Sequence, residues 1–114
     1  RPLMIRKKDI YAVLSVLANH HRDEKEGWMF VLDIMKESGC NSGEVYPVLF
    51  VLERDGRVEH RVEPNIWPIG SKRHEYRVSP HRVNEILTDI LNRNRKQRAR
   101  KGLFARLKPG KARA

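Results

Sequence analysis

Apolar residues in the middle of the chain recur with the period of an α-helix. Four of them stand at positions i, i+3, i+4 and i+7, namely Val45, Val48, Leu49 and Leu52. This spacing buries one side of a helix and leaves the opposite side free. Ser42 or the residue before it is a suitable N-cap, and Asp55-Gly56 ends the run. The pattern predicts a helix over residues 42 to 55, in which Pro47 falls close enough to the first turn to be tolerated.

After Gly56 the period changes from that of a helix to that of a strand. Val58 and Val62 alternate with charged residues, and Tyr76 and Val78 do the same further on. Such alternation is typical of two half-buried strands that form a hairpin, with the nine residues 63 to 71 between them. A helix, a glycine and two short strands in this order describe a winged helix-turn-helix, which points to nucleic acid.

Two more helices precede this segment. The first has Asp9 as its predicted N-cap and is expected to end near His20. The second closes at Ser38-Gly39, and together with the turn and the helix over 42 to 55 it makes the DNA-binding motif. Their apolar faces consist of Ile10, Val13, Leu14 and Leu17 in the first helix, and Phe30, Val31, Ile34 and Met35 in the second.

A last helix has a clear start and an ambiguous end. Ser79 stands at the N-cap and Pro80 at the first helical position. A stripe of apolar residues follows: Val83, Ile86, Leu87, Ile90 and Leu91. Residues 92 to 101 are good helix formers but polar throughout, which predicts a helical extension that leaves the body and stops at Gly102. We expect residues 102 to 114 to form a basic flexible tail.

These elements predict an α+β fold, a winged helix-turn-helix with a three-helix core, a two-stranded wing and a C-terminal helix. The DNA-binding domain is expected to span residues 9 to 82, and the C-terminal helix with its basic extension residues 79 to 101. A chain of 114 residues holds one small core and leaves little for a catalytic cleft.

Charge is distributed unevenly along the chain, whose formal net charge is +10. Residues 1 to 92 hold 14 Lys plus Arg and 14 Asp plus Glu, so their charges cancel. Residues 93 to 114 hold the other ten basic residues and no acid. A cationic segment on a neutral body is typical of polyanion binding, because each cation placed at a phosphate releases a condensed counterion. The alternative interpretation is a solvated tail that serves solubility.

The sequence gives little support to catalysis, metals or membranes. Its apolar runs are far shorter than the roughly 20 residues of a membrane span, and its first residues do not resemble a signal sequence. The single cysteine, Cys40, agrees with a reducing compartment, so we expect a cytoplasmic protein. The histidines lack ligand spacing with Cys40 and no glycine-rich phosphate loop is present, so we expect no enzyme, cofactor or metal.

One set of residues is specific enough to suggest a family. The set consists of Leu14, Leu17, Trp28, Tyr46, Pro47, Leu49, Leu52, Glu53, Asp55, Gly56, Lys72, Arg73, Tyr76 and Arg77. It resembles the Tyr-Pro-x-Leu-x-x-Leu-Glu-x-x-Gly helix and basic wing strand ending in Tyr-Arg of the PadR family of bacterial transcriptional regulators. The resemblance covers about residues 10 to 82 and implies a homodimeric winged-helix repressor whose fourth helix supplies the dimer contact. The stripe from Val83 to Leu91 is then expected to cover the core on one side and a second copy on the other.

The helix over 42 to 55 supplies the first predicted DNA contacts, on the side opposite its buried stripe and on the flanks of that side. These are Ser42, Glu44, Tyr46, Pro47, Phe50 and Arg54. Arg54 is the residue there that can donate two hydrogen bonds to the edge of a guanine. The apolar residues suit thymine methyl groups, and the hydroxyl groups suit phosphates. An equally weighted alternative is that Phe50 and Val51 pack on the wing or on a partner.

The wing and the basic extension supply the remaining predicted contacts. In the wing these are Arg61, Lys72, Arg73 and Arg77, and in the extension Arg93, Arg95, Lys96, Arg98, Arg100 and Lys101. The wing cations suit a minor groove, although their alternation with glutamates fits cross-strand ion pairs equally well. The apolar tip Ile66, Trp67 and Ile69 is expected to fold back on the body, because a small domain seldom leaves a tryptophan exposed. A base-step wedge or a protein contact are the alternatives for the tip.

The sequence therefore favours a transcriptional regulator that binds double-stranded DNA as a homodimer. The first alternative is a winged helix that binds a protein through Phe50, Val51 or Trp67. A second alternative is an RNA-binding or ribosome-associated winged helix held by its arginine-rich segment, since such segments often fold on RNA.

Overall fold

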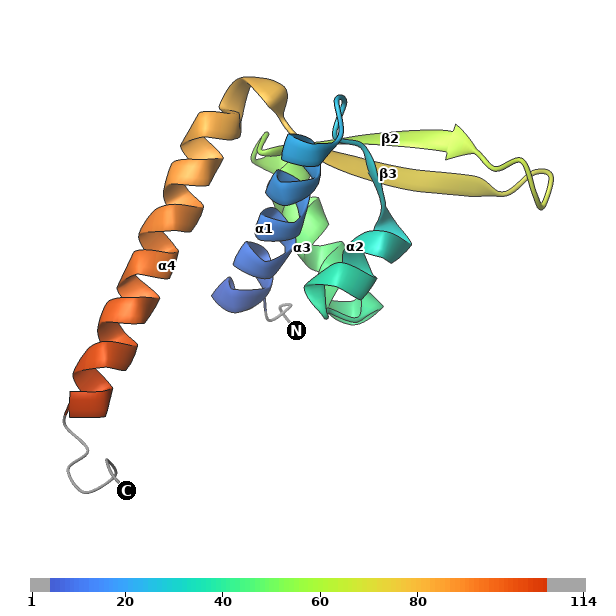
Figure 1. The fold of residues 1–114 in the computed structure, drawn as a ribbon. Helices are drawn as coiled ribbons and strands as arrows, with labels where there is room; N and C mark the ends of the chain where they lie inside the picture. The colour runs from blue at the N-terminus through green and yellow to red at the C-terminus, as the bar shows by residue number, and fades with distance from the viewer. Residues whose placement is uncertain (1–4, 107–114) are drawn as a thin grey trace.

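The computed structural model describes residues 5–106, with side chains described as far as residue 102. Within this range the chain forms an α+β fold of four α-helices, one short 3-10 helix and a three-stranded antiparallel sheet in a winged-helix-like arrangement (Figure 1). The elements are α1 (Lys7–Asp23), β1 (Met29–Phe30), α2 (Val31–Ser38), α3 (Ser42–Arg54), β2 (Val58–Pro64), β3 (Lys72–Val78), η1 (Pro80–Arg82) and α4 (Val83–Arg106). Of the predicted flexible tail, residues 102 to 114, the part from residue 107 onward lies outside the described residues, whereas residues 102 to 106 are helical.

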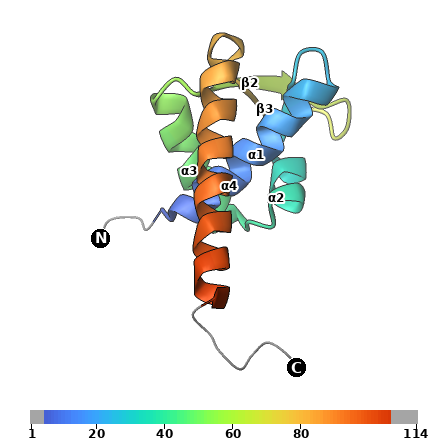
Figure 2. The ribbon, with the colours of Figure 1, turned by 60° about the vertical axis from the view of Figure 1, so that its left-hand side comes forward.

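The apolar stripes predicted from periodicity meet in one core. All four stripe residues of α3, from Val45 to Leu52, are buried, together with Leu14 of α1 and Ile34 of α2. Helix α4 runs beside α1, and its C-terminal end extends beyond the other helices (Figures 1 and 2). The core thus sits between α1, α2, α3 and the base of the hairpin, and the exposed side of α3 stays free.

Helix α3 begins where the sequence predicts, because its first turn is capped twice. The Asn41 side chain accepts a hydrogen bond from the Glu44 backbone N at 3.0 Å. The Glu44 side chain in turn accepts one from the Asn41 backbone N at 2.9 Å, which completes a capping box. After Arg54 the chain turns at Gly56, whose φ of +77° lies in the left-handed region that favours glycine.

The sheet has three strands rather than the two predicted. Strands β2 and β3 form the predicted antiparallel hairpin, with Val58 opposite Val78 and a loop over residues 65 to 71. The short strand Met29–Phe30 pairs with the other edge of β3, so the order is β1-β3-β2. A strand of two residues has no measurable alternation, and its pairing with a segment 45 residues away is a tertiary event that a local pattern cannot show.

Two helices end differently from the sequence prediction. Helix α1 begins at Lys7, before Asp9, and continues past His20 to Asp23. Asp9 is therefore no N-cap: it lies buried in the first turn, where its carboxylate accepts a hydrogen bond from Arg6 Nε at 3.2 Å. Helix α4 continues through Gly102 to Arg106, because one glycine inside a helix costs only about 1 kcal/mol relative to alanine and does not end it by itself.

Ser79 stands at the N-cap position of η1 with Pro80 at the first helical position, as predicted, but its side chain makes no capping hydrogen bond. Its Oγ donates a hydrogen bond to the Gly56 carbonyl at 2.7 Å, and Ser79 is only 2% exposed. We expect Ser79→Ala to lower the free energy of unfolding by about 1 kcal/mol, because the carbonyl loses its donor in a dry site. Urea denaturation measures this loss. The exposed Ser42→Ala serves as the control and should change stability by less than about 0.5 kcal/mol, so equal losses would contradict the role given to Ser79.

Within residues 5–106, none of the helices is both long enough and apolar enough to cross a membrane.

Candidate nucleic-acid interface

One side of the molecule, the inner face, joins the outward side of α3 to the strand face that packs against it. Its members are Ser42, Tyr46, Pro47, Phe50 and Arg54 of α3, and His60, Val62, Lys72 and His74 of the hairpin. Residues opposite one another on paired strands point to the same side, so these four hairpin residues share the side of the buried Val78. Phe50 is 65% exposed and Tyr46 is 45% exposed. Five of the six predicted α3 contacts, all except Glu44, thus lie on this side of the molecule.

The inner face is aromatic and polar but poor in free cations. The His60 ring stacks on Tyr76 with 4.4 Å between centroids, and its Nε2 lies 2.9 Å from Nδ1 of His74. Glu53 Oε1 lies 3.5 Å from the other ring nitrogen of His60. Burial raises the pKa of Tyr76, and the negative charge of Glu53 raises it further. Tyr76 therefore stays neutral near pH 7.

Two predicted α3 contacts already have protein partners. Glu44 completes the capping box and also accepts a hydrogen bond from Arg6 Nη2 at 3.0 Å. Arg54, the predicted guanine reader, lies 3.6 Å from Asp55 Oδ1, but both side chains are at least half exposed. Such a surface ion pair is worth little, so Arg54 remains able to turn toward a ligand.

The opposite side of the hairpin, the outer face, holds three of the four predicted wing cations. Arg61 Nε and Arg73 Nε both donate to the carboxylate of Glu75, at 2.7 Å and 2.9 Å. Arg77 Nε donates to Glu59 Oε1 at 2.9 Å. Burial raises the pKa of Glu75, but the hydrogen bonds from the two arginines outweigh it and hold that pKa below its ordinary value. The second sequence interpretation, cross-strand ion pairs, describes this face.

Two aromatic rings complete the outer face. Arg61 and Arg77 each lie 4.5 Å from the Trp28 ring centroid, and Arg73 lies 4.2 Å from that of Phe30. These rings reach the arginines because β1 adds to the edge of β3. The pattern of alternation did not reveal either ring. The sheet thus separates Arg61, Arg73 and Arg77 from the exposed side of α3, and of the four predicted wing cations only Lys72 lies on the inner face.

The apolar tip of the hairpin does not fold back, so that expectation is wrong. Ile66, Trp67 and Ile69 are 95%, 78% and 83% exposed. The hairpin projects away from the helices (Figure 1), and the loop is closed by its own contacts, including a hydrogen bond from Asn65 Nδ2 to Ser71 Oγ at 2.8 Å. The strands are long enough to carry the tip out of reach of the core.

Ion pairing divides the described arginines into two groups. Each arginine between residues 5 and 92 has a carboxylate oxygen within 3.6 Å. They are Arg6, Arg22, Arg54, Arg57, Arg61, Arg73, Arg77 and Arg82. Among the described residues no carboxylate pairs with the arginines of the α4 extension: Arg93, Arg95, Arg98 and Arg100. The described arginines without a carboxylate partner therefore gather on α4, where Lys96 and Lys101 add two more cations.

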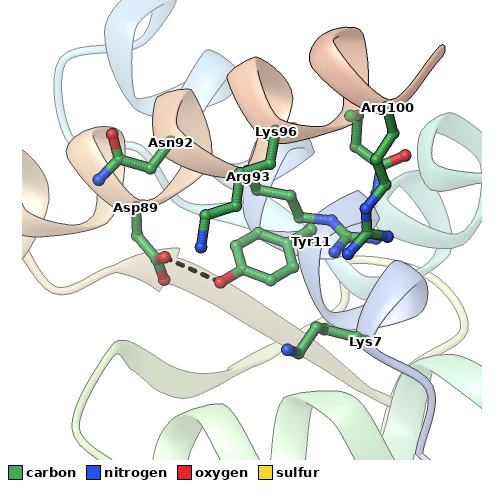
Figure 3. Close-up of a pocket in the computed structure, with 8 residues that line it drawn as sticks. Lys7, Tyr11, Asp89, Asn92, Arg93, Lys96 and Arg100 are labelled. Atoms are coloured by element: carbon green, nitrogen blue, oxygen red, sulfur yellow. Dashed lines mark hydrogen bonds between the residues drawn. The ribbon is translucent and has the colours of Figure 1, made fainter. Parts of the chain in front are cut away.

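The base of the α4 extension is tied to α1, so the extension does not leave the body at residue 92 as predicted. Tyr11 Oη donates to Asp89 Oδ1 at 2.8 Å (Figure 3), and Arg57 Nη2 donates to Asp89 Oδ2 at 3.3 Å. The Arg93 guanidinium lies 4.8 Å from the Tyr11 ring centroid. Burial raises the pKa of Tyr11, and the hydrogen bond to Asp89 raises it further. Neither half of this contact could be assigned from periodicity, because the residues stand 78 positions apart.

The apolar stripe of α4 divides between two sides of the helix. Ile86 and Ile90 are 1% and 8% exposed and cover the core, and Val83 packs partly against it. Leu87 and Leu91 are 39% and 59% exposed and line a hollow between α4 and α1. Helix α4 thus covers the core of its own domain and also carries an exposed apolar edge formed by Leu87 and Leu91.

Comparisons with known proteins support the fold alone. The chain is similar to the crystal structure of the circadian clock associated protein Pex from Anabaena, with 15% sequence identity and a TM-score of 0.56. The match covers 86% of this chain and 84% of that chain. No protein-family model matches the chain, and no curated protein matches it. At this level of identity the similarity extends to the arrangement of helices and strands and not to an activity.

Proposed function

We propose that this protein is a DNA-binding transcriptional regulator of PadR type that represses from a duplex operator. The division of the arginines carries the proposal: each described arginine of the body lies beside a carboxylate, whereas those of the α4 extension have none within the described residues. Unpaired cations on one helix supply the phosphate contacts on which affinity for DNA depends. The winged-helix-like fold provides α3 as the element that enters the major groove.

Sequence reading by α3 rests on few direct contacts. Arg54 is the one described cation on its outward side, and a bidentate contact with guanine contributes roughly 1 to 3 kcal/mol of discrimination. Pro47 and Phe50 present apolar surface suited to thymine methyl groups. The remaining specificity comes from DNA shape, since phosphate contacts from α4 carry no base information. The proposal assigns the chain no catalytic step.

The nucleic-acid class is tested by anisotropy with one 20-base-pair sequence as duplex DNA, duplex RNA and each single strand. We expect duplex DNA to bind at least about tenfold tighter than the other forms at about 100 mM salt, because α3 fits the major groove of B-form DNA and not the narrow one of RNA. Tighter binding to RNA would replace the proposal with the RNA-binding alternative.

Assembly into a homodimer belongs to the same proposal and rests on the outward edge of α4. Leu91→Glu places a charge on that edge without touching the core, so we expect it to convert a dimer at micromolar concentration into a monomer and to weaken operator binding at least about tenfold. Light scattering and anisotropy measure the two effects. Leu32→Glu, at a similarly exposed leucine of α2, is the control and should remain dimeric. An unmodified protein that is monomeric under these conditions would refute the dimer.

A second candidate function is a winged helix that binds a protein. The exposed Phe50 of α3 and Trp67 of the tip favour it, because aromatic side chains of this kind are enriched at protein interfaces. Such binding would change little with salt and would not need the α4 cations. The salt dependence of binding therefore separates this candidate from DNA binding.

A further inference from the structure

A notch lies between the first half of α1 and the α4 extension (Figure 3). Its volume is about 160 Å³, which admits several water-sized groups. Lys7 and Tyr11 line it from α1, one helical turn apart. Asp89, Asn92, Arg93, Lys96, Gln97 and Arg100 line it from α4. Since Arg93, Lys96 and Arg100 stand at i, i+3 and i+7, they share one side of their helix.

The positive charges around this notch have no free negative charge beside them. Lys7, Arg93, Lys96 and Arg100 contribute four cations, and in the described residues none of them pairs with a carboxylate. The one acid of the lining, Asp89, has its two oxygens bound by Tyr11 Oη and Arg57 Nη2. Like charges that converge repel one another, so the notch is electrostatically prepared for an anion.

The lining also limits which anion fits. The Arg93 guanidinium lies over the Tyr11 ring, and this cation–π contact restricts its motion. Asn92 and Gln97 also line the notch and carry neutral amide donors. Several cationic donors around a small space suit a multiply charged oxyanion with many acceptor oxygens. A single carboxylate would leave most of these donors unused.

We propose that this notch is a phosphate-binding site that takes either a compact polyphosphate, free or as part of a nucleotide, or one segment of a nucleic-acid backbone. A free polyphosphate would act as an effector that competes with DNA for the α4 cations. Binding of a nucleic-acid backbone phosphate rests on the function proposed above, whereas binding of a free polyphosphate does not. Both sources share the same chemistry, and the experiment separates them.

The test uses two charge-matched double variants of the full chain. Lys96→Gln/Arg100→Gln removes two cations from the notch, and Arg95→Gln/Arg98→Gln removes two from the opposite side of α4, where both side chains are exposed. Glutamine keeps the helix propensity close to that of lysine and arginine. Calorimetry with inorganic tripolyphosphate and anisotropy with a 20-base-pair duplex are run at about 50 mM salt, where charge contacts are strongest.

For a free polyphosphate we expect tripolyphosphate to bind the unmodified protein saturably. The notch variant should bind it at least about tenfold more weakly, and the opposite-side variant within about threefold of the unmodified protein. For a backbone phosphate, tripolyphosphate should not saturate the protein up to about 5 mM, but the notch variant should lose at least about tenfold more DNA affinity than the opposite-side variant. Each of these results supports the site and names its source.

Equal losses from the two variants in both measurements would overturn the proposal, because net charge and not the notch would then govern binding. Absence of tripolyphosphate binding together with equal DNA losses would overturn it as well. If the protein binds no DNA but binds tripolyphosphate through the notch, the proposed function fails and the phosphate site stands. The two failures are therefore distinguishable.

Discussion

Replacement of the six cations of the α4 extension by glutamine should lower the affinity for duplex DNA by at least about 100-fold at about 100 mM salt. The six are Arg93, Arg95, Lys96, Arg98, Arg100 and Lys101. Each cation at a phosphate adds about 0.9 to the slope of log affinity against log salt concentration, so six contacts account for a slope of about 5. Anisotropy at four or five salt concentrations measures affinity and slope together.

The control for this variant must remove charge without touching α4. Neutralising three exposed lysines of the body, Lys8, Lys25 and Lys36, lowers the net charge but leaves the extension intact. We expect this control to change affinity by less than about threefold, because screened charges outside the interface contribute little. Circular dichroism should report the same helix content in all three proteins, since glutamine is a good helix former. A six-residue variant that behaves like the control would remove α4 from the interface.

Glu75→Ala should destabilise the fold by about 2 kcal/mol at pH 7. Glu75 is 9% exposed and accepts hydrogen bonds from Arg61 and Arg73, so its removal leaves two guanidinium groups of the outer face without their shared carboxylate. Both arginines are about 40% exposed, and water compensates part of the loss. Glu59→Ala is the control, because it removes one ion pair whose carboxylate is 39% exposed. It should lower the free energy of unfolding by less than about 1 kcal/mol.

The pH dependence of this effect identifies its electrostatic origin. The pKa of Glu75 is lowered in the folded protein, so its carboxylate contributes stability above the ordinary glutamate pKa of about 4.3 and loses that contribution as pH falls through the folded pKa. The difference in unfolding free energy between the unmodified protein and Glu75→Ala should therefore narrow below about pH 4. Urea denaturation across this range measures it. A difference that stays constant down to acid pH would mean that Glu75 acts through packing.

Local pattern was sufficient for the elements that bury a long apolar stripe. Helix α3 illustrates this, because its four stripe residues define both its period and its buried side, and Asn41 with Glu44 defines its start. Asp9 is not the N-cap that the sequence predicts, and Ser79 stands at the predicted N-cap position without a capping side-chain hydrogen bond. Both residue types cap helices well, but here their hydrogen bonds go to Arg6 and Gly56, and the second of these partners is set by tertiary packing.

The candidate interface shows the same limit. Arg73 and Arg98 are alike in sequence terms, each a basic residue in a basic segment. The fold distinguishes them, since Glu75 is hydrogen-bonded to Arg73 on the outer face whereas α4 carries no acid after Asp89 in the described residues. Cross-strand register and the addition of β1 decide which cations are neutralised, and neither follows from local composition.

The measurement that tests the central claim most directly is the salt dependence of duplex DNA binding by the unmodified protein. Between about 50 and 200 mM salt, six phosphate contacts from α4 predict a loss of affinity of about 1000-fold and a log-log slope near −5. A steep slope of this kind would support α4 as the main source of phosphate contacts. A slope close to zero, or no binding to any duplex at about 50 mM salt, would contradict the account.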